Sequence, residues 1–311
     1  MGMKLLLIGG SGGLSGCLAR MAVEKGHEVW AVTRGKRSLP EGVHSLIADR
    51  GDEASFARSV EEQGIRWDAA IDCICMNAAH AAQDLEVLPR VTHRLAVVST
   101  DSVYDPLHKE VPQAEETLYY ERGNDYAGNK RRMEEAFLGC RAPGLDWTIF
   151  RPGHIYGPGF ELGCFPEHSR QPDLLRHIRA DQPVRLVGGG TYLTQPVFVE
   201  DLAASLLDCL DKPDTFGEIF CIGGPKAVPN REYYSLIGHI TGHPVTFVEI
   251  PEEGYREAHP EFSGHLCQRC YRLGKLAGAG VRLPDTSLEE GLKRHIAWLD
   301  SIASDAGRAD I

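Results

Sequence analysis

The stretch LLLIGGSGGLSG at residues 5–16 is the feature that most limits what this chain folds into. Its first four residues are apolar, and five of the following eight are glycine. A strand, a glycine-rich turn and a helix together form a site for dinucleotide phosphates, because glycine lets the backbone approach the pyrophosphate and the helix directs free N–H groups at it. A tight strand-to-helix turn without a ligand is the alternative. The residues expected to bind a cofactor here are Gly9, Gly10, Ser11, Gly12, Gly13, Leu14 and Ser15.

Apolar and amphipathic stretches alternate through the first half of the chain. Their hydrophobic spacing predicts strands at 4–8, 28–32, 45–48, 69–74, 95–99 and 146–150. It predicts helices at 14–24, 53–62, 78–88 and 125–137. Serial strand–helix units with apolar strands are typical of a parallel sheet that is covered by helices on both faces. The sequence therefore predicts an α/β fold with a Rossmann-type doubly wound parallel sheet.

The composition of the sequence changes after residue 152, where segments rich in glycine and proline separate shorter elements. Strands are expected at 197–199 and 219–222, and helices at 173–179, 201–210, 231–241 and 288–299. We predict a dinucleotide-binding domain at 1–158, to which 197–224 returns. A smaller C-terminal substrate-binding lobe is predicted from 159–196 and 225–311.

Charge and cysteine content restrict the partners and the compartment. The formal net charge is −11, which argues against binding to nucleic acid or to an anionic membrane surface. No apolar run approaches the ~18 residues that cross a bilayer, and the N-terminus lacks a signal-peptide pattern. Nine scattered cysteines fit reduced thiols and a cytoplasmic location. Cys267 and Cys270 have the spacing of a metal-binding pair, but no second pair follows at zinc-finger spacing, so no metal is predicted.

The end of the second expected strand bears on the choice of cofactor. A site that prefers NAD usually has Asp or Glu there, whereas this chain has Thr33 followed by three cations that begin with Arg34. A guanidinium suits the 2′-phosphate of NADP, so NADP is slightly favoured over NAD. A solvated basic loop is the alternative. Asp49, after the third strand, is expected either to meet the adenine or to cap a turn.

Two groups suited to proton transfer follow the fifth expected strand. Tyr126 and Lys130 are four residues apart and would share one face of a helix. An ammonium beside a phenol favours the phenolate, so Tyr126 would exchange a proton near neutral pH. An ordinary surface pair is the alternative. The strand itself ends in STDSVY (99–104), and the carboxyl ends of parallel strands are where ligands bind.

Four motifs resemble, in order, those of the extended short-chain dehydrogenase/reductases, the NAD-dependent epimerase/dehydratase group. They are GGSGGLS (9–15), STDSVY (99–104), YAGNK (126–130) and RPGHIYGPG (151–159). The resemblance covers most of the chain, because PVFVEDLA (196–203) is similar to a later strand and helix of the group. It implies that Tyr126 is the general acid/base and that Thr100 hydrogen-bonds the reacting oxygen. It implies that Lys130 binds the nicotinamide ribose and lowers the pKa of the tyrosine.

The resemblance also assigns residues around the reacting carbon. It implies four residues on the cofactor side: Asn77, Ser99, Pro152 and His154. It implies three on the substrate side: Tyr104, His154 and Thr194. A structural histidine that satisfies local backbone groups is the alternative for His154.

Two positions depart from the pattern of the group. Dehydratases of the group carry an Asp–Glu pair after the catalytic Thr, and here the pair is Asp101-Ser102, so a complete dehydratase is not expected. Asp101 is then either a catalytic carboxylate or a turn cap. Nucleotide-sugar enzymes often have an Arg, which pairs with the substrate diphosphate, where this chain has Thr194. Either another cation replaces it or the substrate is not a nucleotide sugar; the candidates are Arg170, Arg176 and Arg185.

The leading interpretation is an NAD(P)-dependent epimerase or oxidoreductase. It would act at a hydroxyl-bearing carbon of a sugar or nucleotide sugar through a transient keto form. An NADPH-dependent carbonyl reductase of a non-nucleotide substrate would need the same residues. A non-catalytic NAD(P)-sensing or RNA-binding protein is the third alternative, against which the Thr–Tyr–Lys set and the net charge argue. A homodimer through the helices at 78–88 and 125–137 is expected by analogy with the group.

Overall fold

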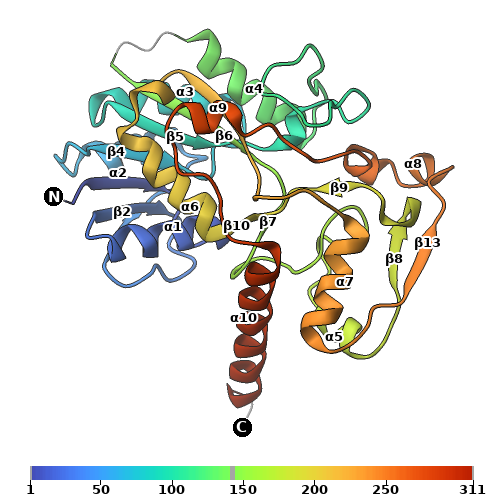
Figure 1. Ribbon diagram of the computed structural model, residues 1–311. Helices are drawn as coiled ribbons and strands as arrows, with labels where there is room; N and C mark the ends of the chain where they lie inside the picture. Colours follow the sequence, from blue (N-terminus) through green and yellow to red (C-terminus); the bar gives the residue numbers. More distant parts are fainter. Residues whose placement is uncertain (1, 141–143, 310–311) are drawn as a thin grey trace.

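A seven-stranded parallel sheet forms the centre of the protein (Figure 1). The computed structural model describes residues 2–140 and 144–309. The strand order is β11-β6-β5-β4-β1-β2-β3, so the chain winds outward from β1 in both directions. The strands are β1 Lys4–Ile8, β2 Glu28–Thr33, β3 Val43–Ile47, β4 Ala69–Asp72, β5 Arg94–Val98, β6 Asp146–Pro152 and β11 Glu218–Ile222. The predicted doubly wound α/β fold is confirmed.

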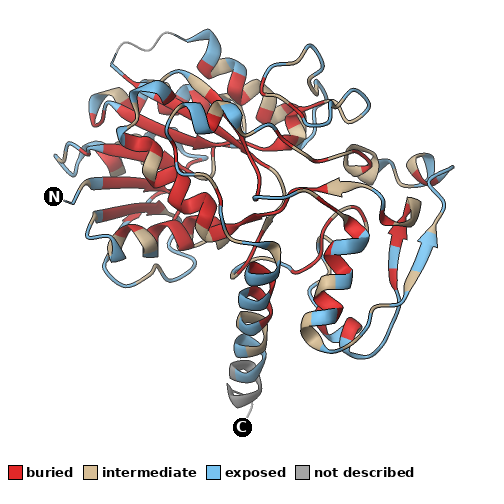
Figure 2. Cartoon of the chain, in the orientation of Figure 1, coloured by how far each residue is buried: buried red, intermediate tan, exposed pale blue. Residues whose placement is uncertain are grey.

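Helices cover both faces of this sheet because its central strands are apolar on both sides. Leu5 and Leu7 of β1 pack in one buried cluster, and Leu6 and Ile8 pack in another on the opposite face. The first face is covered by α1 Gly13–Glu24, α6 Val199–Asp208 and α9 Gly274–Gly278. The second is covered by α2 Glu53–Glu61, α3 Ala78–Val87 and α4 Tyr126–Gly139. Buried residues are concentrated in these layers (Figure 2).

A smaller lobe extends from the carboxyl side of the sheet (Figure 1). It has three two-stranded pairs: β7 Ile155–Tyr156 with β10 Val197–Phe198, β9 Leu193–Thr194 with β12 Val228–Pro229, and β8 Val184–Val187 with β13 Phe247–Ile250. Its helices are α5 Leu174–Arg179, α7 Asn230–Thr241, α8 Tyr255–Ala258 and α10 Leu288–Ala309. An aromatic core that includes Tyr156, Phe198 and Tyr233 joins these elements. The first turns of α10 pack on this core through Leu292 and Ile296.

Short 3₁₀ helices complete the described chain. They are Leu88–Arg90, Asp101–Val103, Gly188–Gly190, Cys209–Asp211, Pro213–Thr215 and Pro260–His265. None of the described helices combines the length and the apolar character that crossing a membrane requires.

The expected elements agree with the structure in the first half of the chain and diverge in the second. All six early strands form, with ends within two residues of expectation. The expected strand at 197–199 forms as β10, but it pairs with β7 and not with the large sheet, which gains β11 instead. The helix expected at 201–210 begins earlier, at Val199, and the one expected at 288–299 continues to Ala309. The division of the chain at 158, 196 and 224 stays a prediction.

Candidate active site

The glycine-rich turn leaves β1 with a conformation and a packing that need glycine. Gly9 has a φ of 96°, in the left-handed region, and its N–H donates to the Val32 carbonyl at 2.9 Å. A Cβ at Gly10 would lie 2.7 Å from the Ala31 Cβ, and one at Gly13 would lie 2.7 Å from the Gly159 carbonyl oxygen. The Ser15 hydroxyl accepts from the Gly12 N–H at 3.0 Å at the start of α1. The turn is therefore bare of side chains where the helix begins.

A cleft of about 1100 Å³ opens beside this turn, and its volume suits a dinucleotide. One wall is the turn itself, a second is the loop after β2, and a third includes Trp298 of α10. Arg37 and Ser38 line the cleft, whereas Arg34 lies exposed and outside its lining. The residues that line it are Gly10, Ser11, Gly12, Gly13, Gly16, Cys17, Arg20, Val23, Glu24, Arg37, Ser38, Leu39, Pro40, Glu41, Gly42, Pro158, Gly159 and Trp298. The bare turn and the cleft fit a dinucleotide cofactor.

Three residues expected on the cofactor side make local contacts. The Asp49 carboxylate accepts from the Gly51 N–H at 2.9 Å and so forms a turn. The Asn77 side chain caps α3 by accepting from the His80 N–H at 2.9 Å. Pro152, the last residue of β6, is buried. Contacts of these residues with a cofactor stay predictions.

Thr100 and Tyr126 meet just beyond the carboxyl end of β5. Tyr126 is the first residue of α4, and its side chain is 53% exposed toward solvent. Partial burial raises the pKa of Tyr126, and a hydrogen bond with the Thr100 side chain opposes that shift. Gly128 has to be small, because a Cβ there would lie 1.9 Å from the Gly123 carbonyl oxygen. This close packing fixes where α4 begins and therefore where Tyr126 lies.

Lys130 lies buried below Tyr126, on the same helix. Its ammonium donates to the Cys75 carbonyl at 2.8 Å and to the Val98 carbonyl at 2.7 Å. Burial lowers the pKa of Lys130, and the neighbouring Cys75 and Asp72 oppose that shift. An ammonium has three donors, so one remains for a ribose hydroxyl. The expected effect of Lys130 on the pKa of Tyr126 stays a prediction.

Asp101, which directly follows Thr100, belongs to a buried ion cluster. Its carboxylate accepts from Arg269 Nη1 at 2.5 Å, from Lys109 Nζ at 3.2 Å and from the Tyr271 hydroxyl. Burial alone would favour the neutral acid, but Arg269 and Lys109 outweigh it and hold the pKa of Asp101 below its usual range. The structure thus places Asp101 in an ion pair. Sequence reasoning missed Arg269, which is 168 residues away and belongs to no motif.

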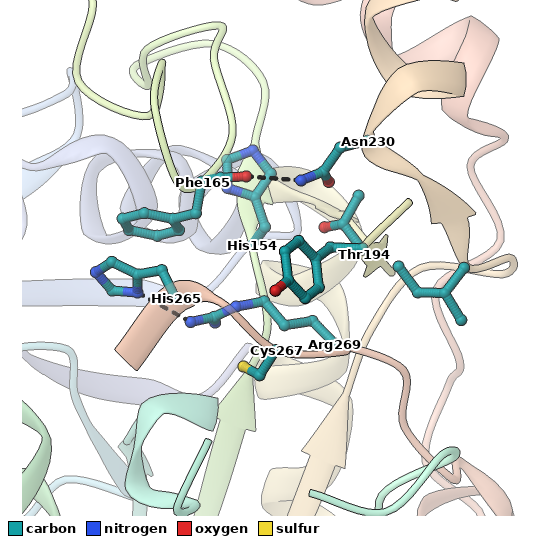
Figure 3. Close-up of a pocket in the computed structure, with 9 residues that line it drawn as sticks. His154, Phe165, Thr194, Asn230, His265, Cys267 and Arg269 are labelled. Carbon is teal, nitrogen blue, oxygen red and sulfur yellow. Dashed lines mark hydrogen bonds between the residues drawn. The ribbon is translucent and has the colours of Figure 1, made fainter. Parts of the chain in front are cut away.

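Figure 3 shows a small pocket that Arg269 of this cluster lines together with residues of the lobe. Its volume is about 10 Å³, roughly what one water molecule needs. His154 and Thr194, two of the expected substrate-side residues, line it together with Arg269. Burial and the nearby Arg269 lower the pKa of His154 to about 4, so its imidazole is neutral near pH 7. The lining is His154, Phe165, Tyr192, Leu193, Thr194, Asn230, His265, Cys267 and Arg269.

The third expected substrate-side residue, Tyr104, lies deeper. It is 2% exposed, and its hydroxyl accepts from Arg151 Nη1 at 2.8 Å and lies 2.9 Å from the Cys221 sulfur. Ser99 also points into the protein, where its hydroxyl donates to Glu134 at 2.7 Å. The expected contacts of Tyr104 with substrate and of Ser99 with cofactor stay predictions.

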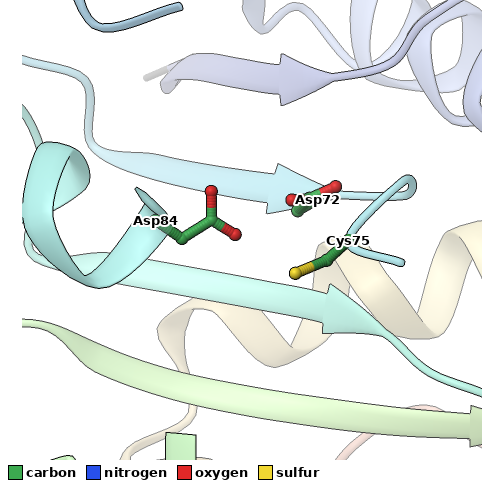
Figure 4. A group of neighbouring side chains, drawn as sticks. All are labelled: Asp72, Cys75 and Asp84. Atoms are coloured by element: carbon green, nitrogen blue, oxygen red, sulfur yellow. The ribbon is translucent and has the colours of Figure 1, made fainter. Parts of the chain in front are cut away.

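A second group of buried acids lies under the carboxyl end of β4. Asp72, Cys75 and Asp84 point toward one another (Figure 4). The Arg50 guanidinium already bonds both carboxylates, through Nη1 to Asp72 and through Nη2 to Asp84 at 2.6 Å. Arg50 is therefore the cation that pairs with these two carboxylates. Sequence reasoning missed this group as well.

A doubly wound sheet with a glycine turn at β1 and a Thr–Tyr–Lys set after β5 defines an extended short-chain dehydrogenase/reductase. The chain belongs to the NAD-dependent epimerase/dehydratase family, whose model matches residues 5–223. It is therefore an enzyme of that NAD-dependent class, as the motifs predicted.

Named relatives give the range of activities in this family. The chain is 27% identical to a 2′-dehydrokanamycin reductase from Streptomyces kanamyceticus, over 81% of this chain and 70% of the relative. It is 28% identical to a chloroplast stem-loop binding protein of 41 kDa from Arabidopsis thaliana, over 72% and 60%. Its fold is similar to that of a UDP-glucose 4-epimerase from Thermotoga maritima, with a TM-score of 0.80 and 20% identity over 97% of this chain and 100% of that one.

Proposed function

We propose that this enzyme interconverts a hydroxyl-bearing carbon and its ketone on a sugar or nucleotide sugar, with Tyr126 as the acid/base. The observation that carries the proposal is the placement of Thr100 directly after β5 and of Tyr126 at the start of α4, at the sheet edge that also bears the glycine turn. Ligands of parallel α/β sheets bind at this edge. The similarity to a 2′-dehydrokanamycin reductase and to the fold of a UDP-glucose 4-epimerase supports the substrate class.

The chain's own groups have separate roles in this reaction. A bound nicotinamide supplies hydride exchange at the carbon. Tyr126 Oη exchanges the proton of the reacting oxygen, and the Thr100 hydroxyl hydrogen-bonds the same oxygen. The remaining Lys130 donor holds a ribose hydroxyl, while its other two donors are fixed by carbonyls. Because two carbonyls fix the Lys130 ammonium, its third N–H would hold the ribose in one position.

An epimerase and a reductase differ in whether the cofactor leaves after each cycle. An epimerase must retain it, because the same cofactor takes the hydride and returns it to the other face. The protein should be purified without added cofactor and denatured, and the released small molecules identified by mass spectrometry. Stoichiometric NAD or NADP supports the epimerase, which we favour. An empty protein that binds NADPH supports the carbonyl reductase, and one that binds neither cofactor contradicts the proposed function.

We propose NADP as the preferred cofactor, with Arg37 as well as Arg34 near its 2′-phosphate. Arg37 supports this because it lines the cleft beside the glycine turn, next to the hydroxyl of Ser38. A guanidinium and a hydroxyl suit a phosphate. Arg34 is the second candidate, since it lies exposed at the end of β2.

RNA binding is a second candidate function, favoured by one observation, the similarity to the stem-loop binding protein. The net charge of −11 opposes it. Retention on RNA at low salt that disappears at about 0.2 M salt would support it. The absence of retention at low salt would leave the enzyme as the function.

Two further expectations belong to the proposal. A homodimer through α3 and α4 is supported by their packing side by side on one face, and light scattering tests it. A cytoplasmic location is supported by nine free cysteines, since a reducing compartment keeps thiols unpaired. Fractionation of the native host tests the location.

A further inference from the structure

The ion cluster behind Thr100 carries more positive than negative charge. Arg269 and Lys109 both bond the Asp101 carboxylate, and the three side chains are only 6%, 3% and 3% exposed. Among the side chains of residues 2–140 and 144–304, no second carboxylate lies within 4.0 Å of either cation. Removing a charge from water is costly unless an opposite charge offsets it. The protein therefore buries one positive charge that its own described residues leave unbalanced.

The donors on the pocket side of this cluster are also incomplete. Arg269 Nε and His154 Nε2 are both buried, and neither has a hydrogen-bond partner among the described residues. Both residues line the same small pocket. Buried polar atoms in proteins nearly always have a partner, which is often a water molecule or a ligand. Arg269 Nε is a donor, and His154 Nε2 is one in the tautomer that carries the proton there, so this pair of nitrogens fits a group that accepts hydrogen bonds.

The arrangement of the cluster leaves Arg269 able to serve such a group. Lys109 Nζ and the Tyr271 hydroxyl reach the same Asp101 oxygen as Arg269 Nη1 does. Asp101 thus keeps two partners when Arg269 shares its charge with a ligand. The pocket has room for about one water molecule, so a compact oxygen anion fits it better than an extended diphosphate does.

We propose that this pocket binds an anionic oxygen of the substrate, from a carboxylate or a single phosphoryl group, through Arg269 and His154. Asp101 connects this pocket to Thr100, because its carboxylate bonds Arg269 and it directly follows Thr100 in the chain. The substrate is then an acidic sugar or sugar phosphate and not a neutral sugar. This assignment rests on the proposed function for the identity of the reacting carbon, but the binding of the anion is measured separately.

Three matched probes separate charge from shape: D-glucose, D-glucuronate and D-glucose 6-phosphate. Each is titrated into the full chain by calorimetry at constant ionic strength. We expect an acidic sugar to bind at least tenfold more tightly than D-glucose, since charge-assisted hydrogen bonds are the strong ones. Preference for glucuronate identifies a carboxylate, and preference for the phosphate identifies a phosphoryl group. Equal results for all three probes, including no binding, would overturn the proposal.

Variants then assign the effect to the pocket. Arg269→Gln should lose the preference for the acidic sugar tenfold or more. Arg272→Gln is the matched control and should keep it, because Arg272 lies in the same segment but is 58% exposed and donates to the Pro112 carbonyl. Retention of the preference by a folded Arg269→Gln protein would contradict the site.

A second substitution, Asp101→Asn, distinguishes a ligand site from a structural ion pair by the direction in which it changes the affinity for the acidic sugar. Asp101→Asn frees Arg269 from its carboxylate, so affinity for the acidic sugar should rise severalfold. A folded variant in which it falls would contradict the proposal. If this variant does not fold, Lys109→Gln decides, with an expected severalfold loss for the acidic sugar alone. The proposed function fails separately, if Tyr126→Phe retains full turnover while anion binding is as expected.

Discussion

Two buried ion networks flank Thr100 along the chain, and they differ in one respect. Ser99, the residue before it, donates to Glu134, whose oxygens also accept from Arg151 Nε at 2.9 Å and Nη2 at 2.7 Å. No polar side-chain atom of these three residues lacks a partner. The residue after it, Asp101, belongs to the cluster that contains Arg269. There, Arg269 Nε has no hydrogen-bond partner among the described residues. The first network is closed, and the second is open toward the pocket.

This difference distinguishes buried charges that stabilise the fold from those that we propose bind a ligand. The closed network joins β5, β6 and α4 inside the sheet layer, where nothing else is needed to satisfy it. The open one joins the end of β5 to residues 269–271 of the C-terminal part. Changes in the closed network should therefore lower stability, and changes in the open network should mainly alter binding.

The largest expected effect is on the chemistry between the two networks. Tyr126→Phe removes the proton-exchanging hydroxyl and should lower turnover by about 10²–10⁴-fold. The unfolding midpoint should stay unchanged, because the Tyr126 ring is half-exposed and belongs to neither network. Steady-state kinetics and thermal unfolding on one preparation measure both. A large loss of stability would show that the Tyr126 hydroxyl stabilises the fold.

The next largest effect is on the closed network. Glu134→Gln leaves the buried Arg151 guanidinium without its counter-charge, which should destabilise the protein by roughly 3–5 kcal/mol. Denaturant unfolding measures the loss. Glu135→Gln is the matched control, since Glu135 is exposed on the same helix and bonds only Arg131. A stability loss no greater than that of the control would mean that the closed network does not hold the fold.

The same contrast between closed and open applies to two buried histidines. His295 uses both ring nitrogens: one accepts from the Gly157 N–H at 3.2 Å, and the other donates to the Phe160 carbonyl at 2.9 Å. His154 Nε2, in contrast, has no hydrogen-bond partner in the part of the chain that the structure describes. Burial lowers the pKa of His295 from 6.5 to about 4. The unfolded chain therefore takes up a proton first as the pH falls. The contribution of His295 to stability should be complete above pH 6.5 and fall by on the order of 3 kcal/mol toward pH 4, and the buried His154 adds a loss of its own over the same range.

Urea unfolding at pH 7 and pH 4.5 measures this dependence. His295→Gln should lose stability at pH 7 and show a shallower fall with acid than the wild type. An identical fall in both proteins would assign the acid sensitivity to other groups.

The smallest expected effect concerns the cofactor cleft. Arg37→Ala should reduce the preference for NADP over NAD by about tenfold, equivalent to about 1.4 kcal/mol, with no change in stability. Arg34→Ala tests the alternative position in the same loop. Binding constants for both cofactors measure the ratio. An unchanged ratio in both variants would contradict the phosphate contact.

Local patterns in the sequence predicted the sheet, which is confirmed, and they also singled out Tyr126 and Lys130, whose roles stay a prediction. The glycine turn, the strand periods and the four-residue spacing of Tyr126 and Lys130 each depend on neighbours along the chain. The contacts of Arg269 with Asp101 and of Arg50 with Asp84 join residues far apart, and no local pattern encodes them. The strands β8 and β13 were missed because they are only four residues each and have exposed positions. Their pairing is decided by packing in the lobe.

The distance along the chain between the two sides of the cofactor cleft has a consequence for biosynthesis. Gly13 belongs to the unit of β1 and α1, whereas Trp298 follows almost three hundred residues later in the chain. So does His295, which holds the 157–160 loop against Gly13. Domains fold from the N-terminus during synthesis, so the sheet forms while one wall of the cleft is still missing. We therefore expect the cleft to be completed late in synthesis, and a nascent chain stalled before α10 to leave the glycine turn open to solvent.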